Sequence, residues 1–195
     1  MRKKSHIFLA KYIVEQLDEQ ALCKHRKAFY LGSILPDCKP SFLTTKHEIQ
    51  GTFGQVQEKI IRLSKVETPD ETNLRAYFRD LGQVIHYVAD YFTFPHNPQY
   101  PGSLKEHFVY EEQLEHSLQE YIVSGEAEKR QRLTDSLDSP EAICSFIRKA
   151  HDAYLRWKNN VEHDCRAIVS LCCQVVYAII RLFVGKNVRL EAKAA

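Results

Sequence analysis

The sequence predicts an all-α fold, a single-domain bundle of about six or seven helices over residues 1–195. Three observations support this class. Apolar residues recur at helical spacing in long segments, and no segment alternates convincingly as a strand. The chain contains only seven Gly and seven Pro, and 44% of its residues are hydrophobic. No Pro/Gly/Ser-rich or repeated segment divides the chain, so we expect one domain with one core.

Two helices are expected before the first loop. The first begins near Ser5, a candidate N-cap, and its apolar residues keep helical spacing to about Leu22. A second, shorter helix is expected over 24–31. The stretch from Gly32 to Asp37 ends this helix, and prolines on both sides of Asp37 predict that this aspartate lies in a loop.

Histidines and carboxylates mark the central helices. The segment that follows His47 has an apolar stripe at helical spacing, and a long helix is expected from about 69 to 92. His86 and Asp90 lie beside the apolar stripe of this long helix, so both side chains should face inward at the edge of the core. Buried Asp and His side chains require polar partners or a metal.

A loop and a further helix follow the long helix. The loop over 94–103 is rich in Pro and contains His96, and the next helix is expected from about Leu104 to Val123. This helix presents His107 and Glu111. The polar stretch that follows, 124–139, is expected to be a mobile connection.

The last two helices complete the predicted bundle. Ser139 as N-cap and Pro140 in the first turn mark the start of one helix. The other is expected over about 162–185. Within it, 167–184 is the longest apolar stretch, but it contains a glutamine and an arginine and repeats at helical spacing. We therefore expect a buried helix and no transmembrane segment.

Composition excludes few functions. The net charge of +2 gives no reason to expect a stable nucleic-acid partner. The basic start, Met1 to Lys4, lacks the apolar segment and cleavage site of a secretory signal, so a cytoplasmic location is expected. The six cysteines show no Cys-x-x-Cys spacing, and we expect reduced, mostly buried thiols.

The chemistry of this sequence is concentrated in about thirty residues. His86 and Asp90 are four residues apart, as are His107 and Glu111, so each pair shares one helix face; His96 lies in the loop between the helices. Two interpretations are open. Each carboxylate can orient a histidine in a buried polar network, or the five side chains can bind metal. Imidazole and carboxylate without cysteine are typical of open, catalytic zinc sites, which favours the second.

Four of the nine histidines are expected to be surface residues or structural residues with satisfied hydrogen bonds. These are His25, His116, His151 and His163.

The ordered motifs resemble the zinc-dependent phospholipase C family, whose fold is shared by zinc-dependent single-strand nucleases. The resemblance extends over residues 5–111. The matching pieces, in order, are Ser5-His6, Gly32 to Asp37, His47, Leu81 to Asp90, Pro95-His96 and His107 to Glu111.

The resemblance implies a cluster of two or three Zn²⁺ ions, with Asp37 also acting as the general base. The third ion would use the amino terminus of the chain as well, and Asp90 would bridge this ion to the first. The implied ligands are Asp37, His47, His86 and Asp90 for one ion, His96, His107 and Glu111 for a second, and His6 for the third.

Two features differ from the family pattern. Family members typically begin with a zinc-binding Trp, a role that Met1, or Arg2 after removal of Met1, would take here. Choline-preferring members have aromatic residues where this chain has Cys38 and Thr44, so preference for phosphatidylcholine is not expected. The head group, and the residues that bind substrate, are not predicted.

The expected function is a zinc-dependent phosphodiester hydrolase of phospholipase C type, in which metal-activated water attacks phosphorus. Two alternatives remain open. One is a nuclease or soluble phosphodiesterase on the same fold, which basic and aromatic residues around the cleft would favour and an apolar rim would not. The other is a homologue that binds metal without catalysis.

Overall fold

The computed structural model describes residues 1–38, 47–65, 71–157 and 160–194. Within these residues the secondary structure is helical and no strand is present, which confirms the predicted all-α class. The α-helices of the described chain are α1 Lys3–Leu17, α2 Gln20–Lys24, α3 Arg26–Ile34, α4 Ile49–Lys65, α5 Glu71–Tyr91, α6 Leu104–Val123, α7 Glu126–Arg130, α8 Pro140–Tyr154 and α9 Val161–Ala194, and two 3₁₀ turns, η1 Pro36–Cys38 and η3 Phe94–His96, lie between them.

The structure contains two short helices that the sequence did not predict. The first predicted helix ends early, because Asp18 adopts a left-handed conformation (φ 43°) after Leu17, and α2 follows as a separate helix of five residues. The segment expected to be a mobile connection contains α7, also of five residues. The count of described helices therefore exceeds the predicted six or seven.

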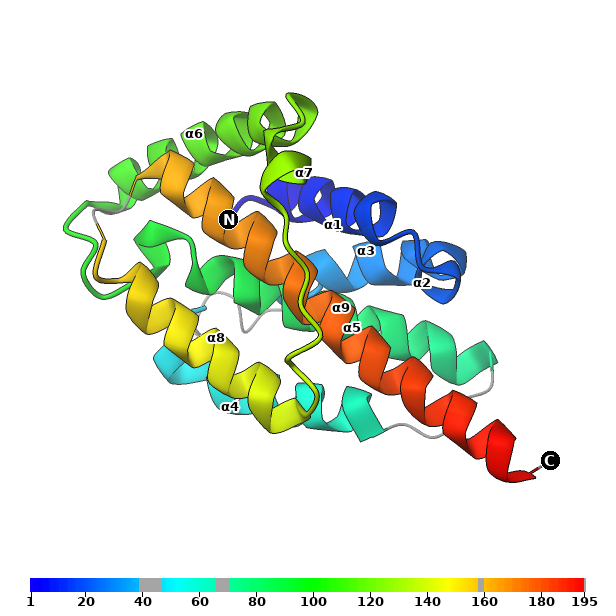
Figure 1. Cartoon of the computed structure of the whole chain (residues 1–195). Coiled ribbons are helices and arrows are strands. Elements are labelled where there is room, and N and C mark those ends of the chain that lie inside the picture. The colour runs from blue at the N-terminus through cyan, green and yellow to red at the C-terminus, as the bar shows by residue number, and fades with distance from the viewer. Residues whose placement is uncertain (39–46, 66–70, 158–159, 195) are drawn as a thin grey trace.

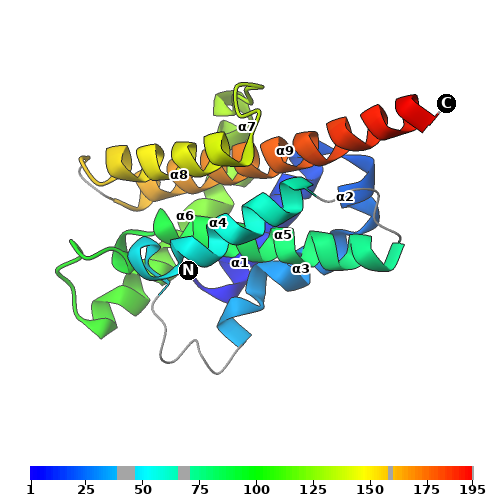
Figure 2. The ribbon, with the colours of Figure 1, turned by 90° about the horizontal axis from the view of Figure 1, so that it is seen from below.

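Helix α5 lies at the centre of the bundle. It packs against α3, α4 and α9, and its buried apolar residues include Leu81, Ile85 and Val88. Figure 1 shows α9 crossing over α5, and Figure 2 shows α8 and α9 side by side as one layer, with α3, α4 and α5 beneath them. This arrangement buries the face of α5 that contains His86 and Asp90.

Two glycines allow α3 and α5 to touch through their backbones. A Cβ atom on Gly32 would collide with the carbonyl of Arg79, and one on Gly82 would collide with the carbonyl of Phe29. The close approach brings the Ser33 carbonyl of α3 within 2.9 Å of His86 Nδ1. The helix contact therefore fixes the position of one candidate ligand.

The cap of α8 agrees with the sequence prediction, and α6 has a cap that was not predicted. Ser103 and Glu106 form a capping box that starts α6, because the Ser103 side chain accepts from the Glu106 amide and the Glu106 carboxylate accepts from the Ser103 amide. Ser139 accepts from the Ala142 amide at the start of α8, with Pro140 as the first helical residue. The bounds of α6 match the predicted range.

Helix α9 contains the one segment of the described chain that is long and apolar enough to cross a membrane. The most apolar window of this segment, Val161–Gly185, has a mean hydropathy of 2.2, but 67% of that window is buried inside the fold. That burial is typical of the core helix of a globular protein, as the sequence predicted. All six cysteines of the chain are free thiols.

Candidate metal centre

The structure brings all eight predicted ligand residues into one cluster, which surrounds the Met1 amino nitrogen. Three helices, two 3₁₀ turns and one residue before α4 contribute these side chains, so the residues are far apart in the sequence. His6 comes from α1, Asp37 from η1, His47 from the residues before α4, His86 and Asp90 from α5, His96 from η3, and His107 and Glu111 from α6.

Asp90 connects the members of the cluster. Its side chain is buried, with 1% exposure. Oδ1 lies 2.7 Å from the Met1 amino nitrogen and 3.3 Å from His6 Nε2. Oδ2 lies 3.0 Å from His47 Nδ1 and 3.3 Å from His86 Nε2. A carboxylate with partners on both oxygens has the geometry to bridge two metal ions, which agrees with the bridging role that the resemblance implies.

The first group of donors has the spacing of a tetrahedral zinc site. Two ligand atoms bonded to one tetrahedral zinc at about 2.0–2.1 Å lie roughly 3.3–3.4 Å apart. The separation between His86 Nε2 and His47 Nδ1 is 3.0 Å, and both nitrogens lie within 3.3 Å of Asp90 Oδ2. Asp37 Oδ1 is 3.5 Å from His86 Nε2, so it can complete this group as the fourth ligand.

The second group lies between η3 and α6. Glu111 Oε1 is 3.1 Å from His96 Nε2 and 3.2 Å from His107 Nε2. The His96 and His107 rings are tilted against each other, with centroids 5.2 Å apart. Both nitrogen–oxygen separations are close to those of tetrahedral neighbours, and the three donor atoms lie within 4.8 Å of one another.

The third group surrounds the amino terminus of the chain. The buried Met1 amino nitrogen lies 2.7 Å from Asp90, 3.0 Å from Glu111 and 3.2 Å from His96 Nε2. The His6 ring stacks on the His86 ring, and donor atoms of these two histidines and Asp37 lie within 4.8 Å of one another. The amino terminus and His6 therefore both lie next to Asp90 Oδ1, and their role as ligands of one ion stays a prediction.

The electrostatics of the cluster favour ligand forms that bind metal. Burial, and then the electrostatic effect of the neighbouring His6 ring, lower the pKa of His86 well below its usual value, so the His86 imidazole is neutral at pH 7. Burial opposes ionisation of Asp90 and Glu111, but the Met1 ammonium and nearby histidines outweigh it and lower the pKa of both carboxyls. Metal ligands must be deprotonated, and these three already are.

Two other groups titrate differently. Burial lowers the pKa of the Met1 amine, but attraction to Asp90 and Glu111 outweighs burial and raises it to about 10. Burial, and then the charge of Asp90, raise the pKa of Asp37. An aspartate whose proton affinity is raised is better suited than an ordinary one to accept a proton from water.

Three observations test whether these residues fit zinc. The donor atoms have the separations of tetrahedral ligands. His6 Nε2 is buried and makes no well-oriented hydrogen bond among the described residues, although Asp90 Oδ1 lies 3.3 Å away. Asp37, Asp90 and Glu111 supply three negative charges around a single ammonium, an excess that divalent cations would neutralise. The donor set fits zinc, and the assignment of individual ligands stays a prediction.

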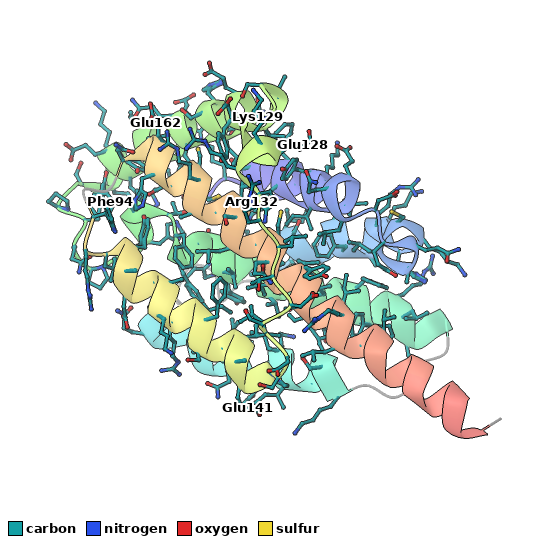
Figure 3. All side chains as sticks on the ribbon, in the orientation of Figure 1. Phe94, Glu128, Lys129, Arg132, Glu141 and Glu162 are labelled. Atoms are coloured by element: carbon teal, nitrogen blue, oxygen red, sulfur yellow. The ribbon has the colours of Figure 1, made fainter. Side chains whose placement is uncertain are left out.

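Asp164 was not identified from the sequence, although it supports the second group. This side chain is fully buried at the start of α9. It accepts hydrogen bonds from the Phe94 amide at 2.8 Å, the Tyr110 hydroxyl at 2.9 Å and the Tyr154 hydroxyl at 2.7 Å. Figure 3 shows Phe94 near the start of α9. Phe94 begins the turn that contains His96, and Tyr110 immediately precedes Glu111, so Asp164 holds both segments in place.

Replacing Asp164 with Ala should weaken zinc binding without removing any ligand. One buried and two partly buried donors would lose their acceptor, at up to about 1–3 kcal/mol each. Loss of a residue that orients metal ligands typically lowers metal affinity about 10–100-fold. Competition with a chromophoric chelator measures this affinity. Asp164→Asn keeps a side-chain oxygen and should recover part of the loss. Zinc affinity within twofold of the original chain in Asp164→Ala would contradict this role.

The other histidines differ from one another in their environment. His151 is buried and pairs with Asn97 Oδ1 at 2.8 Å, and His116 is exposed, as predicted. The prediction for His25 is wrong, because its side chain is buried and its Nε2 has no hydrogen-bond partner among the described residues. No local pattern indicated this, because the burial results from packing of α3 on α5.

Comparison with protein families identifies one match. The family model described as zinc-dependent phospholipase C matches residues 5–161. Searches of curated proteins and of solved structures gave no significant match. The family match extends well beyond Glu111, through α7 and α8, and so includes most of the bundle around the cluster. The chain therefore belongs to the zinc-dependent phospholipase C family.

Proposed function

We propose that this protein is a zinc-dependent phosphodiester hydrolase of phospholipase C type that acts on phospholipids. The observation that supports this most strongly is the paired arrangement of imidazole and carboxylate donors at tetrahedral separations around Asp90. The family match supports the same chemistry. We assign the ligands as the resemblance implies: Asp37, His47, His86 and Asp90 for one ion, His96, His107 and Glu111 for a second, and His6 with the Met1 amine for a third.

The residues of the cluster divide the chemical work. Zinc, when bound, supplies a Lewis acid that lowers the pKa of water and stabilises charge on the phosphate oxygens. Asp37 accepts the proton of the attacking water, because its carboxylate lies at the edge of the first group and burial raises its pKa. The Ser33 carbonyl accepts from His86 Nδ1 and so directs Nε2 into the cluster.

A lipid substrate is favoured by apolar residues next to the cluster. Leu104, Phe108 and Val109 are exposed by 70%, 55% and 46% on the first turns of α6. Phe108 follows His107 directly, and their ring centroids lie 6.1 Å apart. Exposed apolar side chains next to a site are typical of surfaces that contact membranes or partners. These residues form the rim that the lipid hypothesis requires.

The groove beside His107 disfavours a nucleic-acid substrate. It has a volume of about 280 Å³ and includes Glu48, Tyr100 and His107 in its lining. Among the described residues, none of those that line it is Lys or Arg. Nucleic-acid sites depend on such side chains to neutralise phosphates along the strand.

The direct test is hydrolysis by the zinc-loaded chain of a panel of phospholipid dispersions with different head groups. We expect release of phosphorylated head group, loss of activity with a strong chelator and recovery on addition of zinc. Zinc bound without turnover on the whole panel would instead support the non-catalytic alternative. Turnover of single-stranded DNA but not of lipid would support the nuclease alternative.

The double variant Leu104→Ser/Phe108→Ser tests the lipid substrate separately from the chemistry. Insertion of a large apolar side chain into a membrane contributes about 1.5–3 kcal/mol, and about 1.4 kcal/mol corresponds to tenfold. Hydrolysis of vesicles should therefore fall at least about tenfold, and hydrolysis of a monomeric short-chain phospholipid should change less than about threefold. The control is Val123→Ser/Leu133→Ser, which alters two other exposed apolar residues. If the two double variants lower hydrolysis of vesicles equally, the proposed contact of Leu104 and Phe108 with lipid is contradicted.

A further inference from the structure

A basic groove lies between the α2–α3 segment and α5. Its volume is about 740 Å³. The residues that line it include five cationic side chains, all exposed, and no carboxylate among the described residues. The five are Lys24, Arg26, Lys27, Arg75 and Arg79.

The groove is separate from the metal centre. Helices α3 and α5 run parallel, because His25 stacks on Phe78 near one end while the Ser33 carbonyl accepts from His86 near the other. Arg75 precedes His86 by eleven residues on α5, which corresponds to roughly 16 Å along the helix. No predicted zinc ligand lines the groove. A ligand bound to the residues that line the groove would contact none of the predicted zinc ligands.

The nearest acidic residues whose side chains are described have other partners. Asp80 pairs with Arg62 and Lys59 of α4, and Glu19 accepts from the Leu22 amide at the start of α2. Arg75 and Arg79 make no ion pair with a carboxylate whose side chain is described. Converging positive charges repel one another, so an anion in the groove would be stabilised by all of them.

His25 supplies an observation independent of the surface charges. Its side chain borders the groove but is only 7% exposed, stacked on Phe78 with ring centroids 5.5 Å apart. Its Nε2 has no hydrogen-bond partner among the described residues. A buried polar atom without a partner is unusual in native proteins and requires an explanation. An oxygen of a bound ligand would provide the missing partner.

The start of α3 adds to the preference for an anion. His25 is the residue before α3, a helix of nine residues, and no side chain caps this end. The N-terminal end of a helix has a partial positive charge and favours anions. Guanidinium groups such as those of Arg75 and Arg79 match the geometry of phosphate oxygens.

We propose that this groove binds a phosphate group of an anionic ligand, with His25 donating to a phosphate oxygen and the arginines neutralising its charge. Two sources have this chemistry: a soluble phosphate compound, or the phosphorylated head group of an anionic lipid in a membrane. The site is independent of the hydrolase chemistry, so failure of either proposal leaves the other standing.

The test compares two double variants with the same change of charge. Arg75→Glu/Arg79→Glu alters the groove, and Lys11→Glu/Lys149→Glu alters exposed cations on α1 and α8. The probes are pyrophosphate, followed by titration calorimetry and by the NMR signals of the His25 ring, and vesicles of phosphatidylcholine with or without phosphatidylglycerol, followed by cosedimentation. The His25 signals separate binding in this groove from phosphate binding at the zinc ions.

Each outcome has a defined meaning. A soluble source predicts that pyrophosphate shifts the His25 signals and that this shift is lost only in the groove variant. A lipid source predicts at least about tenfold weaker binding of the groove variant, and not of the control, to anionic vesicles, with stronger binding at low salt. Unchanged His25 signals together with equal vesicle binding by both variants would overturn the proposal. If Arg75→Glu/Arg79→Glu folds poorly, Arg75→Gln/Arg79→Gln replaces it.

Discussion

Asp90→Asn is expected to release most of the bound zinc and to lower phosphodiester hydrolysis by about 10³-fold or more. Asp90 contacts the Met1 amine, His6, His47 and His86. The substitution therefore removes a negative charge that lies next to four of the candidate donors. Loss of one partner from a buried charge network costs about 3–5 kcal/mol, and each 1.36 kcal/mol is tenfold in rate. Elemental analysis and initial rates measure both effects on the same sample.

The control for this variant is Asp80→Asn. Asp80 lies on the same helix and is charged and paired, but its partners are Arg62, Lys59 and Gln83, outside the cluster. It should keep the zinc content and rate of the original chain. His86→Ala, which leaves the carboxylate in place, should reproduce the loss if Asp90→Asn folds poorly. Full zinc content with a rate within threefold of the original in both cluster variants would contradict the assignment of Asp90 and His86 as zinc ligands.

Local pattern was sufficient to predict the helices that contain the candidate site. Spacing of four residues placed His86 with Asp90, and His107 with Glu111, on single helix faces, and the structure shows both pairs in the cluster. The start of α8 followed from its capping residue Ser139 and from Pro140, because a cap is a local interaction between neighbours. Such features depend on a few consecutive residues.

The prediction failed where the structure depends on distant contacts. Asp164 lies beyond the motifs, and its role results from packing of α9 against the turn that contains Phe94. His25 became buried because Gly32 and Gly82 let α3 approach α5 closely. The break between α1 and α2 rests on the left-handed backbone of Asp18, which helical periodicity does not reveal. The segment between Asp37 and His47 lies largely outside the described residues, and Thr44 with it.

Asp37→Asn is expected to separate catalysis from metal binding. The Asp37 carboxylate lies at the edge of the first group, 3.5 Å from His86 Nε2 and 3.7 Å from His47 Nδ1. An amide keeps an oxygen that can remain near zinc, but it cannot accept a proton from water. General-base catalysis typically contributes about 10²–10⁴-fold, so kcat should fall by this factor while zinc content stays unchanged in excess zinc.

The pH dependence of the reaction distinguishes a base from a ligand at this position. If Asp37 accepts the proton, the rate of the original chain should fall as pH decreases through the pKa of this carboxyl, which burial and Asp90 raise above its ordinary value. In Asp37→Asn that acidic limb should disappear from the residual activity. Loss of zinc in parallel with the rate would show instead that Asp37 acts as a ligand alone. A rate within threefold of the original would show that Asp37 takes no part in the chemistry, and the attacking water would then lose its proton without help from this side chain.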